Sequence, residues 1–584
     1  MSSDRASELI QSALQLAGAG NRQAALPLLR EAVQADPNSQ GALRCLGFIL
    51  GESGNIQESI DCLKRALKLK PQDYEAAGFL ALKYMESGHF EQAIGALKSA
   101  IEAKPDHAAF HQNLGQVLLQ GGRLAEAEAS FLRAIELDPK SSVGAYVSLA
   151  NLAIDRGEKD RAAWLLHRAY ESDPESVNGK MNLGRSRVQS EDFEAAEKAF
   201  REVIEIAPKL IPARLFLARA LQQLGQFSEA EAVLKDAIAI EPRSAPLYAA
   251  LTVGRKIVSE DKLLVDRMRV LAAAGGLSPG DDAALHFALG KALEDLGEYE
   301  GAMAEFDLAN NQMLKSKPPG WKWDPTKYET VYNHLDQVFT RQFFERRRSL
   351  GSESDRPVFI VGMIRSGSTL LEQTLSSHPD VGAAGELSFW NEVRATLLDA
   401  SGRAVMEQNL KSAQDSFLDL LQRKAPKSLR VTDKMNTDYL NLAFIHLAFP
   451  KAKIIHCTRD PLDTALSIYT TAVTDGFACK RERIIYVYRQ YEKLMKLYQD
   501  RFPAGTMLEV RYEDLVQNQE ETARNVLGFL GLEWNEACLH PERNKRSVST
   551  PTLWQARQPV YGTSVNRSDH YERWLGALAQ LRNG

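Results

Sequence analysis

The stretch V-F-I-V-G-M-I-R-S-G-S-T, Val358 to Thr369, decides the fold of the C-terminal part of the chain. Its first four residues are apolar, as in a buried parallel strand, and a glycine ends the run. A polar loop follows, and a helical pattern begins at about Thr369. Backbone N–H groups and the positive end of the helix dipole face such a loop, so it can bind an anion. The stretch therefore predicts an α/β domain with a phosphate or sulfate site.

The spacing of this loop, G-x-x-x-x-G-S-T from Gly362, nearly matches the P-loop of nucleoside triphosphatases. Ser368 stands where that motif has its lysine, and Arg365 inside the loop supplies the positive charge instead. A planar guanidinium can hold two oxygens of one phosphate or sulfate. The loop therefore suits a phospho- or sulfo-anhydride other than a magnesium-bound triphosphate. A nucleotide kinase is the competing interpretation, and the missing lysine counts against it.

A second strand pattern, Lys453 to Cys457, runs into Thr458-Arg459-Asp460-Pro461 and then into a helix. Arg459 comes at the carboxyl end of this strand, where open parallel sheets bind their ligands. Ser467 follows eight residues later, about two turns along the helix. An arginine and a hydroxyl placed in this way can hold a second phosphate. Alone, an Asp-Pro pair often only begins a helix, so the prediction depends on the first loop as well.

These residues resemble the sulfotransferase superfamily, which transfers a sulfuryl group from 3′-phosphoadenosine 5′-phosphosulfate (PAPS). The family's phosphosulfate loop is usually P-R-S-G-T-T, and here it reads I-R-S-G-S-T from Ile364. The chain is most similar to protein-tyrosine sulfotransferases and their bacterial relatives with tetratricopeptide repeats, over roughly residues 326–575. The resemblance implies a loop that binds the phosphosulfate and a second stretch that binds the 3′-phosphate. The implied PAPS-binding residues are Arg365, Ser366, Gly367, Ser368, Thr369, Arg459 and Ser467.

The same resemblance implies the catalytic groups. Glu386 matches the base that takes the proton of the acceptor hydroxyl, although a glutamate at a helix N-terminus is the plainer interpretation of it alone. Lys434 matches the lysine that neutralises charge on the bridging oxygen, where Arg365 would help. Thr552 falls at the position of a catalytic serine, and Arg567 at that of a lysine that contacts PAPS. No metal is expected, because positioning and fixed positive donors can drive in-line transfer.

The N-terminal half repeats with a period of 34 or 35 residues, marked by prolines. Glycines keep the same register, and small and large residues recur at fixed places between them. This period and pattern are typical of the tetratricopeptide repeat, a pair of helices that stacks into a superhelix with a concave face. The marking prolines are Pro37, Pro71, Pro105, Pro139, Pro174, Pro208 and Pro242.

The chain is therefore predicted to have several domains. An all-α tetratricopeptide superhelix is expected over residues 6–316, with irregular helices at about 244–280. A linker over 317–325 leads to an α/β sulfotransferase domain, P-loop-like with a mainly parallel sheet, over 326–584. Repeat arrays usually bind protein or peptide segments, here a partner or the acceptor itself, and a purely structural scaffold is the alternative. The sequence leaves the oligomeric state open.

Composition excludes several other classes. The net charge of −5 over 584 residues indicates no attraction to nucleic acid or to anionic membranes. Five scattered cysteines without C-x-x-C spacing argue against a zinc site or disulfides and favour a reducing compartment. No signal peptide and no run of ~20 apolar residues is evident, whereas animal tyrosine sulfotransferases carry a membrane anchor. We therefore expect a cytoplasmic protein without membrane contact.

The expected activity is sulfuryl transfer from PAPS to an acceptor hydroxyl, with protein tyrosine as the first candidate. That choice depends on the resemblance and on the attached peptide-binding array. The animal enzymes carry arginines after the catalytic glutamate that favour acidic peptides, whereas here the segment 387–394 has Arg394 as its only basic residue. Carbohydrate or small-molecule hydroxyls are therefore the next alternative. A catalytically inactive interaction protein is the third.

Overall fold

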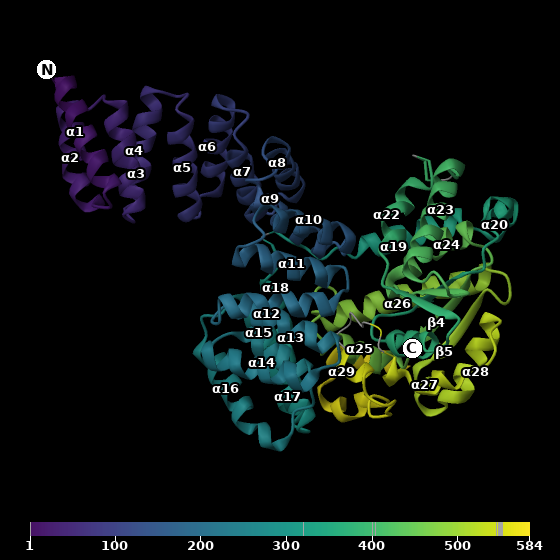
Figure 1. The fold of residues 1–584 in the computed structure, drawn as a ribbon. Coiled ribbons are helices and arrows are strands. Elements are labelled where there is room, and N and C mark those ends of the chain that lie inside the picture. The colour runs from purple at the N-terminus through teal and green to yellow at the C-terminus, as the bar shows by residue number, and fades with distance from the viewer. Residues whose placement is uncertain are drawn as a thin grey trace. The chain divides into compact units, whose positions relative to one another are not determined.

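The computed structural model describes residues 2–318, 320–399, 401–402, 404–544, 546 and 553–583. The chain divides into two compact units, Met1–Ile206 and Ala207–Gly584, and Figure 1 labels the helices and strands of the fold. No helix among the described residues is long and apolar enough to cross a membrane. All five cysteines are buried free thiols.

The first unit consists of two-helix repeats. In most repeats a glycine with positive φ, such as Gly54 at 84°, forms the turn between the two helices. Glu191 takes the same left-handed conformation, with φ 60°, in the one repeat that lacks this glycine. The predicted repeat therefore forms even where a side chain occupies the turn. The helices are α1 (Ser2–Gly18), α2 (Arg22–Ala35), α3 (Gln40–Glu52), α4 (Ile56–Leu69), α5 (Tyr74–Glu86), α6 (Phe90–Ala103), α7 (Ala108–Gln120), α8 (Leu124–Leu137), α9 (Val143–Asp155), α10 (Lys159–Ser172), α11 (Val177–Gln189) and α12 (Phe193–Ile206).

Close packing at small residues holds the two helices of a repeat together. A Cβ on Gly115 would lie 2.7 Å from the ring of Phe131, and one on Gly184 would lie 2.4 Å from the ring of Phe200. Both rings are fully buried. A larger residue at either glycine would push the helices apart, because protein cores have no spare volume.

Repeat-like helices continue into the second unit. The segment at about 244–280, which was predicted to be irregular, holds a short helix, Ala245–Val253, and a second helix, Lys262–Ala274. Two helices of 17 residues then follow. These last two helices belong to the same compact unit as the sheet. The boundaries expected from the sequence, 6–316 and 326–584, stay a prediction. The helices are α13 (Ile211–Gln223), α14 (Phe227–Ile240), α15 (Ala245–Val253), α16 (Lys262–Ala274), α17 (Pro279–Asp295) and α18 (Tyr299–Lys315).

The rest of the second unit is built on a five-stranded sheet in the order β2-β3-β1-β4-β5. All four neighbouring pairs are parallel. The two strands expected from the sequence lie side by side, with Phe359 of one opposite Ile454 of the other. This confirms the predicted fold class. The strands are β1 (Pro357–Val361), β2 (Val381–Gly385), β3 (Arg430–Asp433), β4 (Lys453–Thr458) and β5 (Met507–Arg511).

Helices cover both faces of this sheet. Successive side chains of a strand point to opposite sides, so neighbouring residues pack against helices on different faces. Val358 and Ile360 pack into one apolar cluster with Leu371 and Val526. Phe359, between them, stacks on Phe417 with ring centroids 5.6 Å apart on the other face. The helices are α19 (Thr326–Val338), α20 (Arg341–Arg347), α21 (Ser368–Ser376), α22 (Phe389–Val393), α23 (Glu407–Lys424), α24 (Leu442–Ala448), α25 (Pro461–Tyr469), α26 (Arg481–Arg501), α27 (Tyr512–Gln517), α28 (Gln519–Leu530) and α29 (Leu553–Ala556).

Candidate active site

The loop between β1 and α21 has two residues in left-handed conformations. Arg365 has φ 71° and Gly367 has φ 94°. A Cβ on Gly367 would lie 2.3 Å from the ring of Tyr512, so only glycine fits there. Arg365 has a side chain, which disfavours the left-handed conformation. Non-glycine residues with this conformation cluster at ligand-binding sites, where the surrounding packing holds the backbone in place. The backbone therefore adopts this turn at a cost in strain.

The same loop presents hydrogen-bond donors that the protein does not use. The hydroxyl of Ser366 is buried and has no partner among the described residues. No described side chain caps the first turn of α21, which begins at Ser368. The first N–H groups of a helix have no partner within the helix and favour a negative charge. Ser366, Ser368 and Thr369 thus lie where an anion can take these donors.

Arg365 is a half-buried cation beside other cations. Its Nε donates to the hydroxyl of Ser467 at 3.1 Å. Burial first, and then the charges of Arg459 and Arg567, lower the pKa of Arg365 to about 10, so the group stays protonated at neutral pH. No carboxylate pairs with it in the part of the chain that the structure describes. Even a partly buried charge without a counter-ion is costly, so this arrangement favours an anionic ligand.

Arg459 lies directly after β4 and joins the loop to the second predicted stretch. Its Nη1 donates to the carbonyl of Arg365 at 3.3 Å, and its guanidinium lies 4.9 Å from the ring centroid of Tyr512. Asp463 approaches it at 3.6 Å. The Nε of Arg459 is buried without a partner among the described atoms. The fold therefore brings together Arg365, Arg459 and Ser467, three residues expected to bind one ligand.

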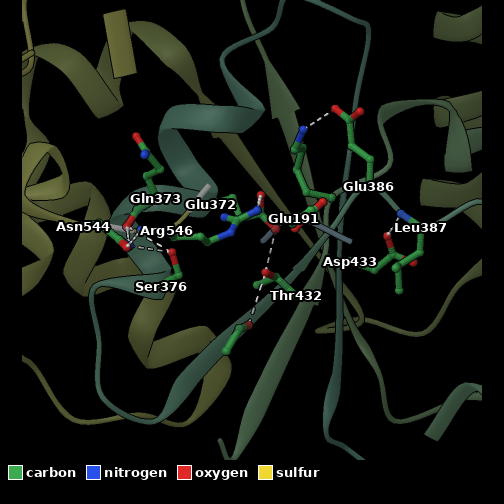
Figure 2. A network of polar contacts seen from close by, with 12 residues as sticks. Glu191, Glu372, Gln373, Ser376, Glu386, Leu387, Thr432, Asp433, Asn544 and Arg546 are labelled. Carbon is green, nitrogen blue, oxygen red and sulfur yellow. Dashed lines mark hydrogen bonds and ion pairs between the residues drawn. The ribbon is translucent and has the colours of Figure 1, made fainter. Parts of the chain in front are cut away.

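Glu386 and Lys434 each follow the end of a strand, β2 and β3. The two strands are neighbours, and the backbone N–H of Lys434 donates to the carbonyl of Gly385 at 2.7 Å. The ammonium of Lys434 forms an ion pair with a carboxylate oxygen of Glu386, as Figure 2 shows. The side chain of Lys434 is 3% exposed and that of Glu386 is 35% exposed. An accessible carboxylate thus stands beside a buried cation at the ligand-binding edge of the sheet.

Comparison with known proteins identifies the domain that carries these residues. The model of a family described as "Sulfotransferase family" matches residues 357–536. Residues 357–536 are a sulfotransferase-family domain. Two tetratricopeptide-repeat models match the N-terminal half, at residues 16–83, 80–142, 147–211 and 187–252. The repeats and the domain were both predicted from the sequence, and both are confirmed.

Similar proteins include an uncharacterized protein of Aquifex aeolicus, 32% identical over 51% of this chain and 41% of its own length. Protein-tyrosine sulfotransferase 1 of Danio rerio is 30% identical over 32% of this chain and 56% of its own length. The chain thus covers less than two thirds of either relative. A solved structure of MamA is 24% identical, with a TM-score of 0.27, over 27% of this chain and 93% of MamA.

Two buried carboxyl groups, those of Asp433 and Asp438, interact near the carboxyl end of β3. Asp433 precedes Lys434, and its Oδ1 accepts from the N–H of Leu387 at 3.3 Å (Figure 2). Burial and then the charge of Asp438 raise the pKa of Asp433 well above its usual range. Burial raises the pKa of Asp438 to about 7. The role of Asp433 was not predicted from the sequence, because nothing local shows that its side chain holds the segment after Glu386.

A second network joins the C-terminal segment of the domain to α21. The fully buried Glu372 pairs with Nη2 of Arg546 at 2.7 Å and accepts from the hydroxyl of Thr432 at 3.0 Å (Figure 2). Asn544 donates to the hydroxyl of Ser376 at 2.9 Å. This network was not predicted from the sequence, in which its signal is a glutamate within an apolar helical pattern.

Two predicted site residues have different outcomes. Thr552 lies outside the described residues. Arg567 lies close enough to Arg365 for its charge to lower the pKa of Arg365. The guanidinium of Arg567 is itself paired with Glu294 of α17, at 2.5 Å. Burial disfavours the charge of Arg567, but Glu294 outweighs it, so the pKa of Arg567 is raised. A partner for Arg567 from the repeats was not predicted from the sequence.

Proposed function

We propose that this protein transfers a sulfuryl group from PAPS to an acceptor hydroxyl, most simply a tyrosine of a protein. The observation that carries the proposal is the half-buried guanidinium of Arg365. It has no described carboxylate partner, it touches Ser467, and Arg459 touches the backbone of the same loop. Such a cluster suits a ligand that has two separate anionic groups, such as PAPS.

The residues present fit that co-substrate. The loop offers the unpaired hydroxyl of Ser366 and the uncapped start of α21 to the phosphosulfate. Arg459 has a buried, unpartnered Nε, and with Ser467 it would hold the 3′-phosphate. Charge-assisted hydrogen bonds of this kind are about twice as strong as neutral ones. ATP would leave the 3′-phosphate residues without a partner, which counts against a kinase.

The proposed transfer needs one base and one source of positive charge. The acceptor oxygen attacks sulfur, and an O–S bond forms as the bond from sulfur to the bridging phosphate oxygen breaks. The carboxylate of Glu386 takes the hydroxyl proton, and its partial exposure lets an acceptor reach it. The bridging oxygen gains the electron pair, and Lys434 and Arg365 stabilise its charge. Adenosine 3′,5′-bisphosphate leaves.

Protein tyrosine is the first candidate acceptor because the relatives include a protein-tyrosine sulfotransferase and because tetratricopeptide arrays bind protein segments. The repeats would then bind the acceptor protein or a partner. One observation favours a second candidate, a carbohydrate or small-molecule hydroxyl. Arg394, the only basic residue of 387–394, donates to the side chain of Asn441 at 3.2 Å, so this segment offers no unengaged arginine to an acidic peptide.

The test is transfer of label from radiolabelled PAPS by the full chain. Tyrosine peptides with flanking acidic residues, neutral tyrosine peptides, matched phenylalanine peptides and a polysaccharide serve as acceptors. Label on tyrosine but not on phenylalanine peptides supports the first candidate, and label on the polysaccharide supports the second. No transfer together with no calorimetric binding of adenosine 3′,5′-bisphosphate would refute the proposal, and tight binding of ATP instead would indicate a kinase.

A further inference from the structure

The end of the repeat array contacts the nucleotide-binding edge of the sulfotransferase domain within the second unit. Glu294 lies in the last turn of α17, and both of its carboxylate oxygens accept from Arg567, at 2.5 and 2.7 Å. The two side chains are 20% and 18% exposed. A bidentate pair fixes the plane of a guanidinium as well as its position. Glu294 therefore determines where the charge of Arg567 lies.

Arg567 passes this constraint to α25. Its Nη2 also donates to the hydroxyl of Thr470 at 2.9 Å. Thr470 is the C-terminal cap of α25 and comes three residues after Ser467. The chain of contacts runs from Glu294 through Arg567 to the helix that carries the proposed 3′-phosphate hydroxyl.

Helix α18 holds the same end of α25 independently. The amide of Asn310, which is buried, donates to the carbonyl of Tyr469 at 2.8 Å. The hydroxyl of Tyr469 donates to Asp307 at 2.5 Å, and Asp307 also pairs with Arg481 at 2.7 Å. Two helices of the last repeat thus fix the end of the helix that carries Ser467.

Charge explains why one carboxylate matters here. Arg365, Arg459 and Arg567 are close enough for their charges to interact, and like charges at short range repel. Asp463 approaches Arg459 at 3.6 Å, and Glu294 pairs with Arg567. Without Glu294, Arg567 loses the partner that holds it near the loop.

We propose that Glu294 is a positioning residue for co-substrate binding, so that the last repeat forms part of the nucleotide site. This inference rests on the proposed function. Glu294 itself would touch no part of the co-substrate and would act through Arg567 and α25. It also gives the repeat array a direct route to the active site, because a shift of α17 would displace Arg567.

The test is calorimetric binding of adenosine 3′,5′-bisphosphate to the full chain and to Glu294→Gln, which keeps the shape but removes the charge. We expect the variant to bind about tenfold or more weakly, the loss typical of one charge-assisted hydrogen bond. Adenosine 5′-monophosphate, which lacks the 3′-phosphate, should lose less affinity. Glu298→Gln is the matched control, since Glu298 is 55% exposed and pairs with Arg269, and it should bind like the wild type.

Each outcome has one meaning. If the wild type fails to bind adenosine 3′,5′-bisphosphate, the proposed function fails and this inference with it. If the wild type binds and Glu294→Gln binds equally well, the inference alone is wrong. Equal losses for both nucleotides would show a purely structural role and would also overturn it. Should Glu294→Gln not fold, Glu294→Asp keeps the charge at shorter reach. Its melting temperature then shows whether it folds, and its affinities for the same two nucleotides test the inference.

Discussion

Replacing Glu386 by glutamine tests the proposed chemistry most directly. The change keeps the shape and removes the base. A positioned general base contributes about 10²–10⁴-fold to kcat, which equals about 2.7–5.4 kcal/mol of activation free energy. Stability should fall as well, because the buried Lys434 loses its charged partner. Breaking a buried pair costs about 3–5 kcal/mol, but Glu386 is 35% exposed, and screening by water reduces the loss to about 1–2 kcal/mol.

The assay is steady-state transfer of label with saturating PAPS and acceptor, run beside urea unfolding and nucleotide calorimetry. The affinity for adenosine 3′,5′-bisphosphate should stay within about threefold of the wild type, because in the proposed mechanism Glu386 serves the acceptor and the charge-assisted contacts to the nucleotide are retained. Glu392→Gln is the control, since that carboxylate is exposed and, among the described residues, bonds only the hydroxyl of Ser388. It should lose neither activity nor nucleotide affinity.

The pH profile of Glu386→Gln also distinguishes the two acceptor classes. A phenol ionises near pH 10, so raising the pH should partly restore transfer to tyrosine. A sugar hydroxyl does not ionise in this range, and its sulfation should not recover. A glutamine variant with near wild-type kcat at saturating acceptor would refute the reasoning and require another base.

Three further predictions concern the loop and its support. Arg459→Ala should weaken adenosine 3′,5′-bisphosphate binding by about 10- to 150-fold in calorimetry, and an equal loss for adenosine 5′-monophosphate would contradict a role at the 3′-phosphate. Gly367→Ala should cost about 1–3 kcal/mol in urea unfolding, because its φ is 94° and Tyr512 lies 2.3 Å from the added Cβ; unchanged stability would mean that the loop relaxes freely. Burial raises the pKa of Asp438 from 3.8 to about 7, so the folded state holds this proton more tightly and the unfolding free energy should fall as the pH rises from about 4 to 7. The unfolding free energy of Asp438→Asn should fall less over that range. A curve parallel to that of the wild type would mean that another group titrates.

The sequence by itself determined the features that depend on neighbouring residues. The 34-residue period required paired helices, because spacing within a repeat sets which faces are apolar. Val358–Thr369 required strand, loop and helix, because an apolar run, a glycine and a helical pattern act over a few residues. The approximate positions of Arg365 and Arg459 at strand ends followed, since parallel strands expose their carboxyl ends at one edge of a sheet.

Only the tertiary structure decided which distant side chains meet. Arg365 and Ser467 are 102 residues apart in sequence, and Arg567 and Glu294 are 273 apart. No local pattern encodes such pairs, because they arise when separately folded helices and strands pack and must neutralise or hydrogen-bond whatever they bury. For the same reason the sequence did not show that Asn310 of the last repeat contacts the end of α25, or that Glu294 reaches it through Arg567. Short motifs thus predict which residues make up the site, and its geometry depends on contacts that form only in the folded chain.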